Sequence, residues 1–381
     1  MGVDHSGREK KHMEFREWHS KANSSSNSFI IYGFPSFQPF HRLLFGVFLS
    51  IYLLTITGNG IVFLLTSLDQ KLRTPMYFFV SHLSFLDLSY ISVTVPKMLA
   101  KFVVNSSIIS LSGCLLQMYF FLSLGATECF LLTAMSFDRY CAICQPLHYA
   151  THMTRRLCTQ LAVAAWTGGF LTPLVHTILA SRLPFCGPNV IHHYYCDHPP
   201  LLKLACADTS LNVAIGSSIA FFVIMSTFSL VLFSYIKIIG SILKISSQGG
   251  KRKAFSTCTS HLIVVNLFYL PIIFMYIRPT ASYVSEVDSL VAMLYSFLTP
   301  TLNPLIYTLR NKDIKEAVKR KMTLLLLPYG VNLGTLNTNQ CNKYLTVFGS
   351  TMPSKVTVTQ RSRYTGAGLR SVPQGDGKLE S

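Results

Sequence analysis

The chain has few charged residues and especially few carboxylates. Only 13% of its residues are charged, and 16 Asp and Glu stand against 33 Lys and Arg, which gives a net charge of +17. Soluble amphipathic helices need a charged or polar face, so the long charge-free stretches exclude that class of fold. The basic residues are scattered between apolar runs rather than gathered on one face, which argues against a nucleic-acid partner. The sequence also lacks a P-loop, a zinc-protease motif and a plausibly placed Ser-His-Asp grouping, so it predicts no enzyme, no cofactor and no metal.

Seven long apolar runs make up most of the remaining sequence. Each reaches the roughly 20 mostly apolar residues that a helix needs to cross a bilayer. Two of the runs hold a single carboxylate each, Asp87 in the second and Glu128 in the third. The runs extend over Leu43 to Leu68, Thr74 to Val95, Cys114 to Met135, Leu157 to Ser181, Thr209 to Ile236, Ala254 to Ile277 and Ser289 to Leu309. The sequence therefore predicts an all-α fold, a seven-transmembrane helix bundle in the plasma membrane.

The positions of the few charges predict how the bundle is oriented. Lys and Arg are concentrated in alternate connections and after the seventh run, and cytoplasmic segments are the ones that retain such residues. We therefore expect an extracellular N-terminus and a cytoplasmic C-terminus, with the first run acting as its own insertion signal. The basic connections carry Lys71, Arg73, Arg155, Arg156, Lys251, Arg252 and Lys253, and the stretch after the seventh run carries Arg310, Lys312, Lys315, Lys319, Arg320 and Lys321.

Composition divides the chain into four parts. Residues 1–42 are predicted to form an extracellular tail and residues 43–310 the membrane domain. In residues 311–322 the apolar side chains share one face and lysines surround the rest, which predicts a short amphipathic helix on the inner leaflet. Residues 323–381 are expected to be a disordered cytoplasmic tail that could be phosphorylated and dock arrestin.

The cysteines and glycosylation signals fit this topology. Cys114, Cys186, Cys196 and Cys206 fall on the outer side, where disulfides can form, and spacing leaves all three of their possible pairings open. Asn23 is a predicted glycosylation site in the N-terminal tail. Asn105 also has the acceptor pattern, but it lies close to the membrane, so its modification stays open.

Several short stretches resemble one receptor family. They are residues 71–79, 83–87, 135–144, 234–235, 253–262 and 300–307, which include Asp138-Arg139-Tyr140 and Asn303-Pro304-Leu305-Ile306-Tyr307. Together they identify the chain as similar to the odorant receptors of the rhodopsin-like G-protein-coupled class, in their larger, tetrapod-type branch. The resemblance covers about residues 23–322, and the stretches from Lys71, Met135 and Lys253 are particular to odorant receptors.

The resemblance implies a set of covalent and signalling features. Disulfides are expected between Cys114 and Cys196 and between Cys186 and Cys206. A small volatile odorant is the implied ligand, and a heterotrimeric stimulatory G protein that raises cyclic AMP is the implied partner. The residues implied in coupling and activation are Asp138, Arg139, Tyr140, Tyr235, Lys251, Lys253, Asn303, Pro304 and Tyr307.

Two of these motifs also have a direct physical interpretation. Arg139 can pair locally at rest and swing into an opening crevice on activation, or it can be an ordinary interfacial arginine that snorkels to lipid headgroups. Pro304 removes one backbone hydrogen bond, and the carbonyl that is freed needs a polar partner. We expect a hydrated polar network in the inward half of the bundle, formed by Asn59, Asp87, Glu128 and Asn303.

The ligand is expected between the outward halves of the helices. Residues of the third helix that recur at one-, three- and four-residue steps share a face, and the resemblance places that face inside the bundle. The predicted lining is mostly apolar and uncharged, which suits a small neutral volatile molecule and argues against an amine. Leu270 replaces a glycine that is usual in the family and is expected to fill space at the base of this site. The predicted lining residues are Phe121, Leu122, Gly125, Ala126, Cys129, Gly216, Ile219, Ala220, Val223, Ile272, Ile273, Tyr276, Met293 and Ser296.

Two features of the sequence allow other interpretations. The second outer connection is rich in histidine from His192 to His198 and could bind copper or zinc, but a disulfide at Cys196 would remove its thiolate. A plasma-membrane transporter or channel is the alternative function. Transporters are commonly built from two similar halves with broken helices at matching places, and the sequence shows no such repeat.

Overall fold

The computed structural model describes residues 28–33, 40–104, 108–186, 189–277, 285–310 and 312–326. Within these ranges, seven helical segments are long and apolar enough to cross a membrane, so the predicted all-α seven-helix bundle is confirmed. Asn23, Asn105 and the tail from residue 327 onward lie outside the described residues.

Five of the spans are single helices, and two are interrupted. The single helices are α2 (His41–Leu68), α3 (Pro75–Val104), α4 (Leu111–Cys144), α9 (Ser210–Lys244) and α10 (Gln248–Tyr276). The fourth span breaks next to Pro173 into α6 (Arg155–Leu171) and α7 (Leu174–Ser181). The seventh consists of α11 (Ser285–Met293), the π-helical turn η5 (Leu294–Leu298) and α12 (Thr299–Arg310).

Capping residues explain why several helices begin outside the apolar runs. The Ser247 hydroxyl accepts a hydrogen bond from the backbone N–H of Gly250, so α10 begins six residues before the apolar run at Ala254. Ser110 and Thr154 cap α4 and α6 in the same way. A side-chain oxygen at this position satisfies a backbone donor that the first helical turn cannot pair internally. Helix length is thus set by the caps, whereas apolarity marks only the part suited to lipid.

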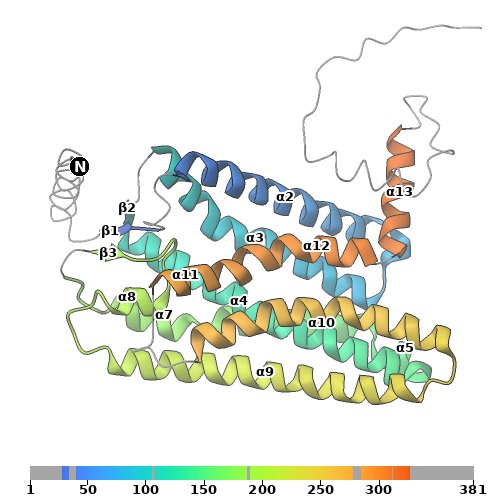
Figure 1. The fold of residues 1–381 in the computed structure, drawn as a ribbon. Helices are drawn as coiled ribbons and strands as arrows, with labels where there is room; N and C mark the ends of the chain where they lie inside the picture. The colour runs from blue at the N-terminus through green and yellow to red at the C-terminus, as the bar shows by residue number, and fades with distance from the viewer. Residues whose placement is uncertain are drawn as a thin grey trace, which may run out of the picture. The chain divides into compact units, whose positions relative to one another are not determined.

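The helix α4 lies at the centre of the bundle, in contact with α3, α6, α7, α9 and α10 (Figure 1). Its middle is almost entirely buried. By contrast, α9 presents large apolar side chains outward, and Phe222, Ile236 and Leu243 are 68–69% exposed. This pattern suits a helix whose outer face meets hydrocarbon rather than water.

One end of the bundle carries a small sheet, and we call it the sheet end. The strands are β1 (Ser28–Ile31), β2 (Ile108–Ser110) and β3 (Val190–Ile191), in the order β2-β1-β3. β1 is antiparallel to β2 and parallel to β3. The sequence had placed residues 28–31 in a tail. They form a strand instead because three consecutive apolar residues, Phe29 to Ile31, bury their side chains there.

The connection between α7 and α9 also lies at the sheet end and contains the short helix α8 (His198–Leu202). Two disulfides hold it. Cys114 on α4 is joined to Cys196 with a Cα–Cα distance of 5.4 Å, and Cys186 is joined to Cys206 at 5.9 Å. Both distances lie in the usual range for disulfides. The pairing implied by the family resemblance is therefore the one in the structure.

The opposite end, which we call the Arg139 end, contains η2 (Gln70–Leu72), η3 (Pro146–His148), α5 (Tyr149–His152) and α13 (Lys312–Leu326) (Figure 1). α13 corresponds to the predicted amphipathic helix but continues four residues beyond it. Ile314 and Ala317 are fully buried against the bundle. The Arg320 guanidinium bonds the Asp69 carboxylate at 2.8 Å, and this hydrogen bond lowers the pKa of Asp69.

The first prediction is covalent. Digestion of the unreduced protein should release the peptides that contain Cys114 and Cys196 joined together, because a disulfide links these two residues. Peptide mapping by mass spectrometry, with a reduced sample as the control, measures this. Recovery of a free Cys114 thiol from the unreduced sample would contradict the assignment.

Candidate functional site

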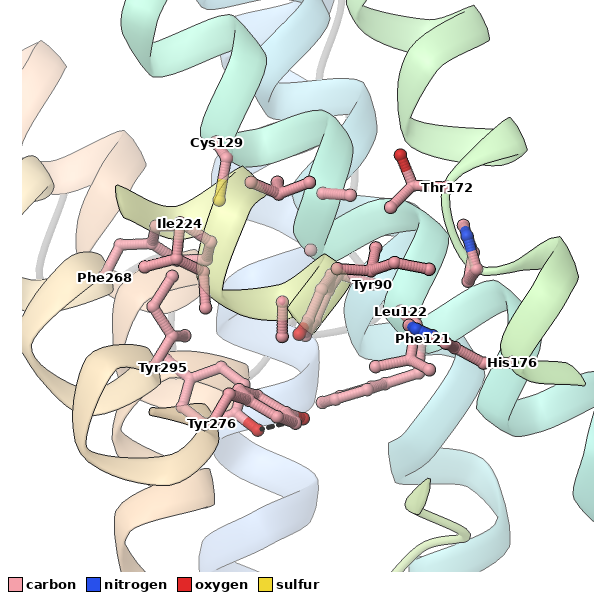
Figure 2. Close-up of a pocket in the computed structure, with 17 residues that line it drawn as sticks. Tyr90, Phe121, Leu122, Cys129, Thr172, His176, Ile224, Phe268, Tyr276 and Tyr295 are labelled. Carbon is pink, nitrogen blue, oxygen red and sulfur yellow. Dashed lines mark hydrogen bonds between the residues drawn. The ribbon is translucent and has the colours of Figure 1, made fainter. Parts of the chain in front are cut away.

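A cavity lies among α3, α4, α7, α9, α10 and η5 on the sheet-end side of the bundle (Figure 2). The space between its lining atoms, the open mouth included, is about 550 Å³. None of the 17 described residues that line it is an acid, a lysine or an arginine. The walls are aliphatic and aromatic, with a few hydroxyl groups and one imidazole. The arrangement can hold a small molecule by burying its apolar surface.

Most of the residues predicted to contact a ligand line this cavity. The face of α4 that was predicted from residue spacing contributes its full set, and the predicted faces of α9 and α10 contribute most of theirs. These lining residues are Phe121, Leu122, Gly125, Ala126, Cys129, Ile219, Ala220, Val223, Ile272 and Tyr276. The 3.6-residue period of a helix indicated that these α4 residues share one face, and the family resemblance placed that face inside the bundle.

Four predicted residues lie elsewhere. Gly216 packs against the ring of His198, because a Cβ at this position would come within 2.8 Å of that ring. The Ser296 hydroxyl bonds the Tyr194 hydroxyl at 2.7 Å, and Ile273 and Met293 are partly buried in the surrounding core. Ser296 lies within the π-helical turn, which inserts an extra residue and so changes which side chains of the seventh span face the cavity. Tyr295 consequently occupies the wall that had been assigned to its neighbours.

Residues that the sequence had not suggested complete the lining. Two of them left a signal in the sequence. Pro173 marks a break in the fourth apolar run, and His176 is an ionisable residue inside that run. The others are ordinary apolar or aromatic residues whose facing depends on how the helices pack. The additional lining residues are Tyr90, Thr172, Pro173, His176, Ile224, Phe268 and Tyr295.

The expectation for Leu270 is wrong. Its side chain is 57% exposed and does not line the cavity. Leu270 precedes Pro271 on the outward face of α10, whereas Phe268 and Ile272 face inward. The leucine that replaces the family's usual glycine therefore does not fill the base of the site.

The loop between α7 and α9 covers the sheet-end side of the cavity with a cluster of tyrosines around Asp197. The Tyr276 and Tyr195 hydroxyls each lie 3.3 Å from the Asp197 carboxylate. The Tyr295 hydroxyl lies 3.0 Å from that of Tyr195 and 3.2 Å from that of Tyr276. Burial raises the pKa of Asp197 to about 6, although hydrogen bonds from His198, Tyr276 and Tyr195 oppose this shift. The Asp197 carboxylate is thus surrounded by phenol groups.

The histidine-rich part of this loop was also considered as a copper or zinc site. In the described part of the chain, no three His, Cys, Asp or Glu side chains come together in a way that could hold an ion. Cys196 is consumed in its disulfide, and burial lowers the pKa of His193 to about 3.

Part of the predicted polar network is assembled in mid-bundle. The Asn303 amide donates to the Asp87 carboxylate at 2.9 Å. The Asn59 amide donates to the Pro300 carbonyl at 2.8 Å, which is the carbonyl left free because Pro304 has no N–H. Glu128 is fully buried, and its two oxygens have no hydrogen-bond partner among the described residues.

Arg139 is locked at the other end of the bundle. It is only 9% exposed, and its Nε donates to the Asp138 carboxylate at 3.0 Å. The Tyr149 hydroxyl donates to the second oxygen of Asp138 at 2.7 Å. On the neighbouring helices α9 and α10, the Tyr235 hydroxyl and the His261 ring are 2.7 Å apart. The predicted local pair of Arg139 with Asp138 is therefore present.

The remaining residues predicted for coupling lie around this end. Tyr307 is buried at the end of α12, and its hydroxyl has no partner in the part of the chain that the structure describes. Tyr140 is half-buried beside Phe137. Lys251 and Lys253 lie in the first turns of α10. Pro304 packs closely against Gly58, where a Cβ would meet its ring at 3.0 Å.

Receptors of the G-protein-coupled class have this organisation, with seven membrane-spanning helices, a cavity towards one end and a buried Asp-Arg pair at the other. Sequence comparison narrows the class. The sequence profile of the olfactory receptors matches residues 48–324, and the chain belongs to the olfactory receptor family. It is therefore a multi-pass plasma-membrane receptor for odorants that couples to a G protein, and it is not an enzyme.

Individual relatives match over most of their length. Human olfactory receptor 6N1 is 55% identical over 294 residues, which are 77% of this chain and 94% of that protein. Human olfactory receptor 10C1 is 50% identical over 300 residues, covering 78% and 96% of the two chains. Mouse olfactory receptor 8U3 is 45% identical over 296 residues, covering 78% and 93%.

The second prediction concerns the size of the cavity. A Cβ built on Gly125 lies 3.6 Å from the Tyr90 hydroxyl, which is an ordinary contact, whereas the further carbons of a leucine would enter the cavity. Gly125→Leu should therefore abolish the cellular response to every volatile agonist, and Gly125→Ala should retain it. Dose–response curves at equal surface expression measure the difference. A normal response from Gly125→Leu would contradict the site.

The third prediction concerns Asp87. Asp87→Asn keeps the size of the side chain and an oxygen that can accept from Asn303, but it removes the charge. If the mid-bundle network changes between two states, this substitution should shift basal or maximal signalling more than agonist potency. Ser92→Ala, on an exposed position of the same helix, is the control. Unchanged basal and maximal output would leave Asp87 with a structural role only.

Proposed function

We propose that the cavity is the odorant site and that its ligand is a small, mostly apolar, uncharged volatile molecule. One observation supports this proposal: apart from the imidazole of one histidine, the described residues of the cavity wall have no acidic or basic side chain. A charged ligand placed there would lose its hydration without gaining an opposite charge in direct contact. An apolar molecule would instead be stabilised in proportion to the surface that it buries, roughly 25 cal/mol per Å².

We further propose that the Arg139 end faces the cytoplasm and the sheet end faces outward. The connections at the Arg139 end carry Lys71, Arg73, Arg155 and Arg156, and lysines and an arginine follow on α13. Such a concentration of positive charge favours the cytoplasmic side. The disulfides at the sheet end agree with an oxidising, extracellular setting.

The signalling partner that we propose is a stimulatory G protein, which raises cyclic AMP. Arg139 is held by Asp138, and Tyr149 shares the same carboxylate, so the guanidinium is unavailable to a partner in this state. Separation of α9 and α10 from α4 would open the space beside Arg139 and let its side chain leave Asp138. Arrestin is a candidate second partner through the C-terminal tail, which lies outside the described residues.

The fourth prediction tests this role. Arg139→Ala should reach the cell surface and fail to raise cyclic AMP when cells are exposed to a panel of volatile alcohols, ketones, esters and hydrocarbons. Arg156→Ala removes an exposed arginine at the same end of the bundle and should respond as the wild type does. Surface labelling and a cyclic AMP reporter are read from the same cells.

Two outcomes would count against the proposal. A full cyclic AMP response from well-displayed Arg139→Ala would remove Arg139 from the coupling mechanism. A wild-type response that appears only as calcium release, with unchanged cyclic AMP, would show that the partner is a different class of G protein.

A further inference from the structure

Among the described residues, the imidazole of His176 in the cavity wall has no hydrogen bond. His176 lies on α7, is 8% exposed and lines the cavity. Within the described part of the chain, neither nitrogen of its imidazole has a hydrogen-bond partner. Figure 2 shows the ring on the side of the cavity away from Phe268, with Leu122 and Phe121 beside it. A buried polar group normally has a partner, so an unpaired one in a cavity wall points to a ligand that supplies it.

The position of this ring is fixed from the loop side. The rings of His176 and His198 lie 5.4 Å apart, and His198 is held between the Asp197 cap of α8 and Gly216. Burial, and then the neighbouring His176, lower the pKa of His198 to about 4, so His198 carries no charge that would repel or pair with His176 at neutral pH. The loop therefore supports His176 sterically but supplies no partner for its nitrogens.

Most other polar groups of the wall are already engaged. The Thr172 hydroxyl donates to the Gly168 carbonyl at 2.6 Å. The Tyr276 hydroxyl lies within hydrogen-bond distance of Asp197 and Tyr295, so its hydrogen is used within the tyrosine cluster. The Tyr90 hydroxyl also belongs to the cavity wall. It can rotate to donate or accept, whereas the imidazole needs a partner at a fixed place.

The chemistry of an imidazole narrows the ligand class. In its neutral form it has one N–H donor and one lone-pair acceptor, and which nitrogen carries the hydrogen is not observed directly. A carbonyl can bond only the N–H, and a hydrocarbon can bond neither nitrogen. A hydroxyl group can donate to one form and accept from the other, so it can bond whichever nitrogen faces the cavity.

We propose that His176 is the polar anchor of the cavity and that it selects small volatile alcohols, with the hydroxyl at His176 and the hydrocarbon part against α9 and α10. This inference rests on the proposed function, because it takes the cavity to be the odorant site. It assigns to α7 a specificity-determining contact that the predicted lining residues did not include.

The test compares two volatile series of equal chain length, linear alkanols and the matching 1-chloroalkanes, which replace the hydroxyl by a group that hydrogen-bonds poorly. On wild-type receptor the alkanol should be roughly 2- to 12-fold more potent, the range expected for one net hydrogen bond. In His176→Phe, which keeps a ring without nitrogens, the two potencies should become about equal. His176→Gln supplies both a donor and an acceptor and should restore a preference for the alkanol.

Three further samples keep the result interpretable. His176→Leu repeats the loss in case the larger Phe side chain hinders folding. Val175→Ala, at an exposed position of the same helix, should keep the wild-type ratio. Tyr276→Phe should weaken both series alike, because it loosens the tyrosine cluster rather than removing the anchor.

The outcomes separate this inference from the function on which it rests. Three results would show that His176 is not the anchor, although the cavity would remain an odorant site. Alkanols and chloroalkanes could be equally potent on the wild type, or ketones or esters could activate it while alkanols do not. The third such result is that displayed His176→Phe and His176→Leu keep the preference for the alkanol. If no volatile of any class activates the wild-type receptor or raises the melting temperature of the purified protein, the proposed function itself fails.

Discussion

The structure depends on one constraint, namely that a bundle surrounded by hydrocarbon must satisfy its own backbone hydrogen bonds. Pro304 and Pro271 each remove one helical N–H, which leaves the carbonyls of Pro300 and Leu267 without their usual donor. Side chains from other helices compensate in both cases. Asn59 of α2 donates to Pro300, and the Thr299 hydroxyl donates to Leu267 at 3.3 Å. The broken helices are thereby joined to their neighbours at the points where they are weakest.

The sequence was sufficient for those parts of the structure that follow from lipid and from regular helix geometry. The seven spans, the shared face of α4 and the need of the Pro300 carbonyl for a partner were all accessible from residue type and spacing, whereas the family resemblance was needed to turn that face inward. The disulfide pairing was accessible only through family resemblance, because four cysteines on one side allow three pairings.

The sequence was not sufficient where position depends on long-range packing. β1 pairs with segments about 80 and 160 residues away, so no local pattern separates it from a tail. Because of the π-helical turn, Tyr295 lies in the cavity wall in place of its predicted neighbours. The sequence of residues 294–298 alone does not indicate the extra residue. His176 is a different case. The rule that marks ionisable residues inside a span as functional candidates was applied to the carboxylates Asp87 and Glu128, and it holds equally for an imidazole.

The helix α10 connects the two functional ends physically. Phe268 and Tyr276 line the cavity on either side of Pro271, and His261 lies further along the same helix, bonded to Tyr235 near Arg139. A helix bends most easily at a proline, because the missing hydrogen bond lowers the resistance to bending there. The cavity therefore contacts the segment of α10 on one side of Pro271, and His261 lies in the segment on the other side. The Thr299 bond to Leu267 is 3.3 Å long, and the shorter Asn59 bond joins α12 to α2. Residues of the cavity wall and residues beside Arg139 thus share one helix, which Pro271 interrupts between them.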